Sequence, residues 1–509
     1  MKKIHLLITT AILVGSCLFS CKKQLNPALD TVTQSEAAGS PDYLKSIVLG
    51  TYTKLRYLSG NSDVLFNAEC TGDACIVPTR IGGDWADGGT HIQFWLHQYT
   101  PAHGAISGAW NDIYNTIGSL NITISLLQGL PTVPTQSIAE LKVVRAYQYY
   151  LLLTNWGNVP LIVSSSTNAS TAKTTQATDI YNFLITELKT NALLLSSKTP
   201  TQDPSQYGRM NKWGAYFLLA KLYLNQNVIT GSTDNSGYTA CSQYCDSLMN
   251  SGYSLQPNFL DNFSSNNNQG NNENIFVVPY DHVYATGENI QMTTFHYNQA
   301  AKYSWGSTGG PWNGFSTNAD YFQMFNTSDT RRAGFQFGIQ YQLDGVTPIL
   351  TRGSDSSLVL NFRPQVSSLT NATEYDGVRM QKWQLTPGNA NQDADWACFR
   401  YADVLLMKAE CMYRLGSPSA ALTYTAPVRA RAGMPNFSAA AFALDTILNE
   451  RGREFVWEGW RREDLIRFGH FGDKKQFKNF VDPNKNAQLL PIPTTAINAN
   501  PNLTQNPGY

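Results

Sequence analysis

Five aromatic residues stand in stretches of the sequence that are too rich in Gly, Ser, Thr and Asn to form a core. They fall between Gly60 and Thr100 and around residues 303–317, and they are Trp85, Trp95, Tyr303, Trp305 and Trp312. A flat indole or phenol ring can cover the apolar C–H face of a sugar while neighbouring polar groups bond its hydroxyls. The pattern therefore indicates a carbohydrate-binding surface. Trp85 and Trp305 are the first candidates, and Trp312 fits a structural role equally well.

The chain lacks the short motifs of several enzyme classes. It has no Gly-x-Gly for a dinucleotide or kinase loop, no Gly-Lys pair for a P-loop, and neither Gly-x-Ser-x-Gly nor His-Glu-x-x-His. A glycosidase needs only two carboxylates across a cleft, so that alternative stays open. The candidate carboxylates are Asp84, Asp87, Asp376, Asp393 and Asp395.

Histidine and aspartate spacing gives little support for a metal site. His91, His97 and His103 recur at six-residue steps, which do not share a helix face, so we predict no joint metal site. Asp84 and Asp87 with nearby loop oxygens could hold a structural calcium ion, although no Asp-x-Asp-x-Asp-Gly loop is present. We expect no cofactor.

Two segments, 400–403 and 450–464, carry acidic and basic residues three and four positions apart. The residues are Arg400, Asp403, Glu450, Arg451, Arg453, Glu454, Glu458, Arg461 and Asp464. Opposite charges at this spacing pair along a helix face, and arginine forks bind carboxylates of neighbouring helices. We expect a structural network here and not a catalytic array.

The first residues have the pattern of an export signal. Lys2 and Lys3 precede an apolar run from Ile4 to Phe19. The run ends in Leu-Phe-Ser-Cys21, which resembles the bacterial lipobox, so we expect residues 1–20 to be removed and Cys21 to be lipidated. No later stretch supplies eighteen consecutive apolar residues, so attachment to a membrane would be through this lipid.

Composition favours an ordered globular protein with a neutral ligand. Of 509 residues, 42% are hydrophobic, and 37 basic residues balance 37 acidic ones. A net charge of zero provides no basic field to attract nucleic acid. Six further cysteines permit disulfides in an exported protein, and Cys70 with Cys75 is the plausible local pair.

Helical periodicity dominates the coarse secondary structure. The predicted helices are Ser137–Trp156, Thr178–Leu195, Arg209–Asn225, Phe399–Leu415, Pro418–Ala432 and Thr446–Phe468. Polar stretches predict surface loops at 60–100, 226–239, 264–274 and 306–317, and short β-prone runs occur at 275–279 and 358–362. We expect a mainly α fold of degenerate tetratricopeptide-like helix hairpins, with long irregular loops and a few short strands.

Several motifs together point to one family. Residues 400–410 read Arg-Tyr-Ala-Asp-Val-Leu-Leu-Met-Lys-Ala-Glu, and residues 450–469 follow E-R-x-x-E-F-x-x-E-G-x-R-x-x-D-L-x-R-x-G. Earlier come Gly-Asn-Val-Pro-Leu at 157–161 and Gly-Arg-Met-Asn-Lys-Trp at 208–213, and Leu-Pro-Ile-Pro follows at 490–493. These segments resemble the SusD/RagB family, surface lipoproteins of Bacteroidetes, over nearly the whole chain after residue 20.

The resemblance implies a single unit over 21–509, with an N-terminal half at 21–230 and a C-terminal half at 270–509. It implies a non-catalytic protein that binds an oligo- or polysaccharide and delivers it to a SusC-like TonB-dependent transporter. The protein would be lipid-anchored in the outer membrane and face the cell exterior. Lys22 and Lys23 stand where relatives are often acidic, which leaves a periplasmic face open.

The sequence also allows other functional interpretations. A member of the same family could bind a glycoprotein or a peptide, because ring stacking does not identify the ligand. A tetratricopeptide scaffold that binds only protein, or a glycosidase, would be a different class.

Overall fold

The computed structural model describes residues 40–130, 133–305, 310–352 and 358–509. The expected signal peptide and Cys21 lie outside these residues. Within the described ranges, no helix combines the length and the apolar character needed to cross a membrane.

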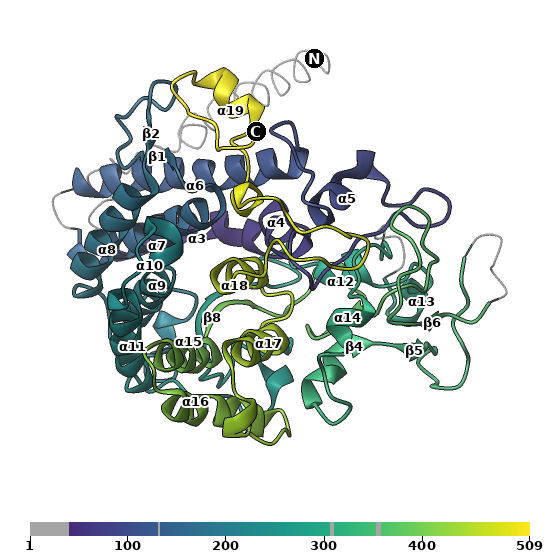
Figure 1. The fold of residues 1–509 in the computed structure, drawn as a ribbon. Coiled ribbons are helices and arrows are strands. Elements are labelled where there is room, and N and C mark those ends of the chain that lie inside the picture. The colour runs from purple at the N-terminus through teal and green to yellow at the C-terminus, as the bar shows by residue number, and fades with distance from the viewer. Residues whose placement is uncertain (1–39, 131–132, 306–309, 353–357) are drawn as a thin grey trace, which may run out of the picture.

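Helices fill the N-terminal half of the chain (Figure 1). They are α3 (Pro41–Tyr52), α4 (Asp63–Cys70), α5 (Thr90–Trp95), α6 (Gly104–Gln128), α7 (Thr135–Trp156), α8 (Ala177–Ala192), α9 (Lys212–Leu224), α10 (Gln226–Thr230) and α11 (Ser236–Met249). In α6, seven-residue steps bury Ile106, Ile113, Leu120 and Leu127 on one face. That face packs against α7, which packs in turn against α8.

The C-terminal half adds short helices and a second group of long ones. They are α12 (Ile290–Thr294), α13 (Gln299–Lys302), α14 (Ala319–Phe322), α15 (Tyr401–Arg414), α16 (Pro418–Arg431), α17 (Leu444–Glu454), α18 (Arg461–Phe468) and α19 (Thr494–Ala499). Helix α15 packs against α16 on one side and α11 on another, so helix pairs continue from one half into the other. This arrangement confirms the predicted mainly α, tetratricopeptide-like fold.

Strands are short and antiparallel. In the described part of the chain they form four pairs: β1 (Val159–Pro160) with β2 (Thr174–Thr175), β3 (Asn274–Val278) with β8 (Trp396–Arg400), β4 (Phe335–Gln336) with β7 (Arg379–Met380), and β5 (Gly338–Ile339) with β6 (Asn361–Phe362). Every residue of β3 and β8 is buried, and β8 leads directly into α15. This pair therefore anchors the start of α15 in the core.

One predicted helix is divided. Residues 446–468 form α17 and α18 and not one helix, because the intervening Trp457 and Gly459 have left-handed backbone, with φ of 61° and 85°. An α-helix cannot continue through residues in that conformation.

Two predicted loops contain helices. The 60–100 stretch holds α4 and α5, where Ser62 caps α4 by accepting the Leu65 N–H and Phe94 is buried. The 226–239 stretch holds α10 and the start of α11, in which Cys241 and Cys245 are buried. In both cases a few apolar positions outweigh the polar composition.

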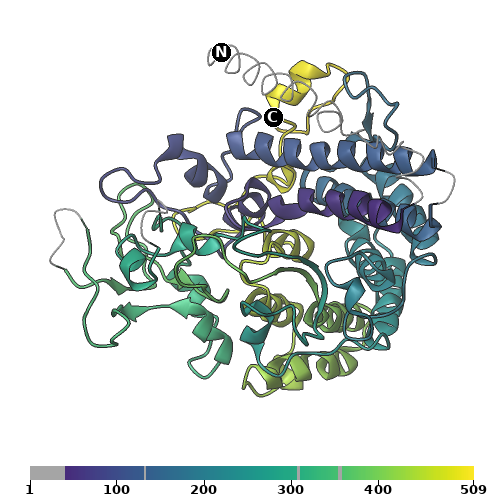
Figure 2. The same ribbon diagram turned by 180° about the vertical axis from the view of Figure 1, so that it is seen from behind.

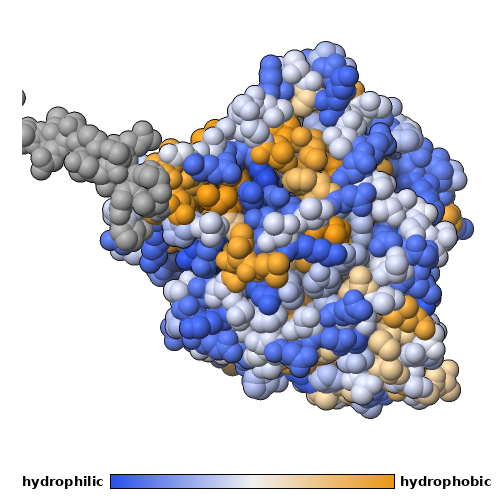
Figure 3. Space-filling view, turned by 90° about the vertical axis from the view of Figure 1, so that its left-hand side faces the viewer, coloured by the Kyte–Doolittle hydropathy of each residue, from blue (hydrophilic) through white to orange (hydrophobic). Residues whose placement is uncertain are grey.

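The main core extends along the whole described chain, from Leu44 to Ile492. The described cysteines are free thiols, including Cys70 and Cys75, whose sulfur atoms lie 3.9 Å apart. Figure 3 shows the face that carries α8 and α10, where hydrophobic patches alternate with polar residues. Leu193 is 75% exposed and Val228 is 47% exposed near these helices.

Candidate functional site

Trp85 joins two loops that lie far apart in the sequence. Its indole N–H donates to the carbonyl oxygen of Trp312 at 2.6 Å. Its ring lies against Gly314 so closely that a Cβ at that position would come within 2.2 Å of it. The ring centroid of Phe315 lies 5.3 Å away, edge to face. The half-buried Trp85 therefore holds the two loops together and exposes only part of its surface.

The backbone at this junction is strained. Trp85 and Asn313 both adopt left-handed conformations, with φ of 63° and 56°. A non-glycine residue in this region costs on the order of 1–3 kcal/mol and persists only where its surroundings enforce it. Such strain is common at binding sites.

Two buried arginines hold these loops in place. Arg80 donates to the carbonyl oxygens of Asn313 at 3.0 Å and Gly314 at 2.8 Å. Arg379 donates to the side-chain oxygen of Asn313 and to the carbonyl oxygen of Glu374, each at 2.8 Å. Burial lowers the pKa of both guanidinium groups, that of Arg80 to about 10. The arginines thus form a rigid frame beneath the loops.

Tyr297, Arg352 and Asp84 form a solvent-facing group beside this frame. The Arg352 guanidinium stacks 3.3 Å from the centre of the Tyr297 ring. The Tyr297 hydroxyl donates to Asp84, and Arg352 pairs with the same carboxylate. The side chains of Arg352 and Asp84 are 47% and 42% exposed. The group offers a flat surface flanked by hydrogen-bond donors and acceptors, which is what a sugar ring requires.

Glu374 fixes the position of Arg352. Its Oε2 accepts the Arg352 backbone N–H at 2.7 Å and lies 2.8 Å from His296 Nε2. The Asn298 N–H donates to His296 Nδ1, so Nε2 carries the proton toward Glu374. Burial alone would raise the pKa of Glu374, but the bonds from His296 and Arg352 outweigh it and lower that pKa. The carboxylate is therefore ionised and unsuited to act as a general acid.

Trp305 does not lie on an exposed loop. Its side chain is 1% exposed and packs with Phe295 and Tyr303, at centroid distances of 5.9 and 5.1 Å. The prediction that its ring faces solvent is wrong, because Trp305 is enclosed in a small apolar cluster with Met292 and Phe295. Tyr303 and Trp312 lie half-buried at the edge of that cluster.

Trp95 is also a core residue. It is 1% exposed, its indole N–H donates to the Gln476 carbonyl oxygen at 2.6 Å, and Lys475 Nζ lies 4.3 Å from the ring centre. A ring enclosed in this way cannot contact a ligand. Of the five aromatic candidates, Trp85, Tyr303 and Trp312 keep partly accessible surfaces.

The charged C-terminal segments form buried ion pairs. Arg400 contacts Glu454 at 2.8 Å and Glu458 at 2.7 Å, and Arg453 contacts Glu450 at 2.6 Å. Burial alone would raise the pKa values of Glu450 and Glu454, but the surrounding arginines lower both to about 2. The group is completed by Glu273, Asp329, Arg331, Lys382, Arg429 and Arg431.

A second set of pairs surrounds Arg451. This residue contacts Asp403 at 2.5 Å and Asp464 at 2.8 Å. Arg461 lies in neither group and pairs with Asp73 at 2.7 Å. The nine residues expected to form one network are therefore divided between two buried groups and one separate pair.

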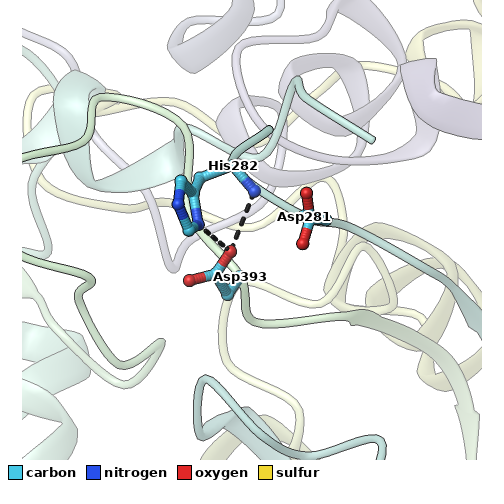
Figure 4. A group of neighbouring side chains, drawn as sticks. All are labelled: Asp281, His282 and Asp393. Carbon is cyan, nitrogen blue, oxygen red and sulfur yellow. Dashed lines mark hydrogen bonds and ion pairs between the residues drawn. The ribbon is translucent and has the colours of Figure 1, made fainter. Parts of the chain in front are cut away.

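The described residues bring one group of possible metal ligands together, Asp281, His282 and Asp393 (Figure 4). His282 Nδ1 lies 2.6 Å from an Asp393 oxygen. Asp281 accepts the backbone N–H groups of Val283 and Tyr284, each at 2.8 Å. These bonds account for the conformation of the group, which we assign to the fold.

The histidines considered for a metal site have separate partners. His97 bonds Asp482, and His103 lies 3.1 Å from the Thr90 carbonyl oxygen. At the calcium candidate, Asp84 accepts a hydrogen bond from the Tyr297 hydroxyl and pairs with Arg352.

The sequence did not reveal the residues that build the site. Tyr297, Arg352 and Glu374 meet only in the folded chain, and the frame arginines Arg80 and Arg379 come from opposite halves. A usable signal was present, because an isolated arginine among Gly, Ser and Thr residues, as at Arg80 and Arg352, needs a partner.

Comparisons with known proteins agree with this architecture. Residues 354–509 match the model described as SusD family, and residues 81–224 match the model described as starch-binding associating with outer membrane. The starch-binding protein SusD of Bacteroides thetaiotaomicron is 26% identical over 438 residues, covering 77% of this chain and 76% of that protein.

Solved structures show the same fold. The surface glycan-binding protein A of Bacteroides thetaiotaomicron superposes with a TM-score of 0.74 at 21% identity, over 93% of this chain and 100% of that one. The complex of a surface glycan-binding protein A from the same organism with laminarihexaose superposes with a TM-score of 0.73 at 21% identity, over 92% and 99% of the chains. Taken with the motifs at 400–410 and 450–469, these matches show that the chain belongs to the SusD/RagB family.

Proposed function

We propose that this protein binds a neutral glycan, without catalysis, at the solvent-facing group formed by Tyr297, Arg352 and Asp84. The observation that carries the proposal is the stack of Arg352 on Tyr297 above the frame of Arg80 and Arg379. A preformed surface of this kind lowers the entropy cost of binding. Trp85, Tyr303 and Trp312, which are half-buried, are candidates to contact further sugar units.

The pairing of the charged side chains supports a neutral ligand. Asp84 is paired with Arg352, and Glu374 lies between Arg352 and the protonated nitrogen of His296. Both carboxylates are therefore already engaged by hydrogen-bond donors and are not free to bind a cationic ligand. The similar proteins named as starch-binding or as complexes with laminarihexaose point to the same ligand class.

The state of Glu374 supports binding without turnover. Glycoside hydrolysis requires a carboxylic acid whose pKa is raised so that it can protonate the leaving group. The pKa of Glu374 is instead lowered by its bonds to His296 and Arg352. Its role in the proposal is to hold Arg352.

The location and partner are part of the same proposal. Lipidation of Cys21 would tether the protein to the outer membrane, with the ligand site facing the cell exterior. A TonB-dependent transporter of the SusC type would receive the glycan. The matching model described as associating with outer membrane supports this placement.

Native gels cast with soluble starch or laminarin test the ligand class. The protein should migrate more slowly in at least one polysaccharide gel than in a blank gel, and Tyr284→Ala, whose ring is 90% exposed outside the site, should behave like the wild type. Incubation with the retarding polysaccharide should release no reducing ends. Equal migration in all gels contradicts glycan binding, and released sugar contradicts the absence of turnover.

A further inference from the structure

A groove of about 580 Å³ lies between α6 and α19, apart from the loop surface formed by Tyr297, Arg352 and Asp84. Its floor is one side of α6, and its walls are the segment 160–170 and the region of α19. Figures 1 and 2 both show α19 and the connection between β1 and β2 lying beside each other above α6. Pockets of this size hold small-molecule ligands in other proteins.

The floor is aromatic and aliphatic. Trp110 and Tyr114 lie one turn apart on α6 with ring centroids 4.7 Å from each other. The Tyr114 hydroxyl donates to the Pro160 carbonyl oxygen at 2.9 Å, which fixes the ring across the groove. Ile122, further along the same face, is 63% exposed. Trp110 is only 5% exposed and packs beneath Tyr114, so the half-buried Tyr114 and the exposed Ile122 supply the accessible apolar floor, which gains free energy when a ligand covers it.

The walls are polar but uncharged. Exposed amides of Asn111 and Asn115 line one side, and exposed hydroxyls of Ser164, Thr167 and Thr495 line the others. All the residues that line the groove are uncharged. A charged ligand would lose its hydration without gaining an ionic partner, so the groove suits a neutral one.

Gly118 lies in the floor of this groove. It stands in the middle of α6, where glycine is less favourable than alanine. A Cβ at this position would meet no atom within 4 Å, so internal packing does not require the glycine. Gly50 and Gly104 have equally open surroundings but lie near helix ends. The missing side chain keeps the centre of the groove open to an occupant from outside.

We propose that this groove is a second carbohydrate-binding site, which takes a neutral oligosaccharide. A pyranose chain has apolar faces that would cover the Tyr114 and Ile122 floor, and its hydroxyls would reach the amides and hydroxyls of the walls. A partner helix would pack on the apolar floor, but it would leave the polar side chains of the walls without hydrogen-bond partners. The groove site does not depend on the loop surface.

Hydrogen-exchange mass spectrometry of the full chain carrying Cys21→Ser tests the proposal, with maltoheptaose and laminarihexaose as neutral probes and a hexagalacturonate as the charged control. At least one neutral probe should slow exchange in residues 160–170 and 495–503, and the hexagalacturonate should not. Tyr297→Ala should keep this protection even where it removes protection at the loop surface, so the two sites are tested separately.

Gly118→Leu fills the groove and should abolish the protection of 160–170. Gly50→Leu, which adds the same side chain at an open helical glycine outside the groove, is the matched control. Circular dichroism shows whether both variants are folded. The proposal is overturned if neither neutral probe protects 160–170, if the charged probe protects it equally, or if protection survives Gly118→Leu.

Discussion

Arg352 and Tyr297 form a stacked pair whose two members also bond the same carboxylate, that of Asp84. The Arg352 side chain is 47% exposed although it pairs with Asp84, so the stacked pair offers a partly accessible planar surface that carries hydrogen-bond donors. Glu374 and the buried arginines hold this platform at its back.

Arg352→Ala should weaken glycan binding, because hydrogen bonds from a charged donor contribute about 1.5–3 kcal/mol, or about tenfold or more in affinity. Arg352→Lys should restore only part of the loss, since an ammonium group cannot stack as a planar fork. Calorimetric titration of the three proteins measures this. Equal affinities for wild type and Arg352→Ala would show that Arg352 does not contribute to glycan binding.

Trp305→Ala should lower stability by about 3–5 kcal/mol, the usual cost of deleting a large buried ring. The side chain is 1% exposed, and its removal leaves a cavity beside Phe295. Urea unfolding gives the stability, and titration of the folded fraction should show glycan affinity close to that of the wild type. A stable variant that no longer binds would show that Trp305 belongs to the ligand site after all.

Glu454→Gln should make the free energy of unfolding depend less on pH in the acidic range. In the folded protein the pKa of Glu454 is about 2, below its ordinary value of 4.5. The ionised carboxylate therefore contributes its full stabilisation above pH 4.5, and this stabilisation is lost as the pH falls toward 2. A shift of this size corresponds to about 3 kcal/mol. Urea unfolding at pH 7, 4.5 and 3 should show a shallower pH dependence in the variant than in the wild type.

The same variant should be less stable at pH 7, because Arg400, Arg431 and Arg331 lose a buried partner. Asp320→Asn, at an exposed carboxylate, is the control and should follow the wild type. Parallel pH profiles for wild type and Glu454→Gln would show that this carboxylate does not stabilise the fold through its charge.

Cys21→Ser should release the protein from membranes, because a lipid on Cys21 is the proposed anchor. Fractionation of cells that lack the transporter measures this, and metabolic labelling with a fatty acid should mark only the wild type. Complete retention of the serine variant in the membrane fraction would show that the anchor lies elsewhere.

The sequence predicted the fold well where apolar spacing controls structure. Residues 399–415 were expected as a helix and α15 runs from Tyr401 to Arg414, since small and branched residues recur every three or four positions. The paired charges were also predictable, because opposite charges recur three and four positions apart. The break between α17 and α18 was not, because it depends on the left-handed conformation of Trp457.

The site was predicted less well, because composition does not measure burial. Asn313 and Ser316 are both fully buried, although the polar stretch 306–317 suggested a surface loop. Arg80 and Arg379 come from opposite halves of the chain, and both donate hydrogen bonds to Asn313. These bonds enclose the polar stretch within the fold. Only the folded chain shows these partners, so Trp305 was misplaced and Tyr297 was overlooked.

Calorimetric titration of wild type and Tyr297→Ala with a glycan that retards the protein in gels tests the central claim most directly. Tyr284→Ala serves as the matched control for an exposed tyrosine. Tyr297→Ala should lose the platform and bind about tenfold or more weakly at the loop surface, with unchanged helical circular dichroism. Wild-type affinity in the folded Tyr297→Ala variant would contradict the assignment of the ligand site to the Tyr297 and Arg352 pair.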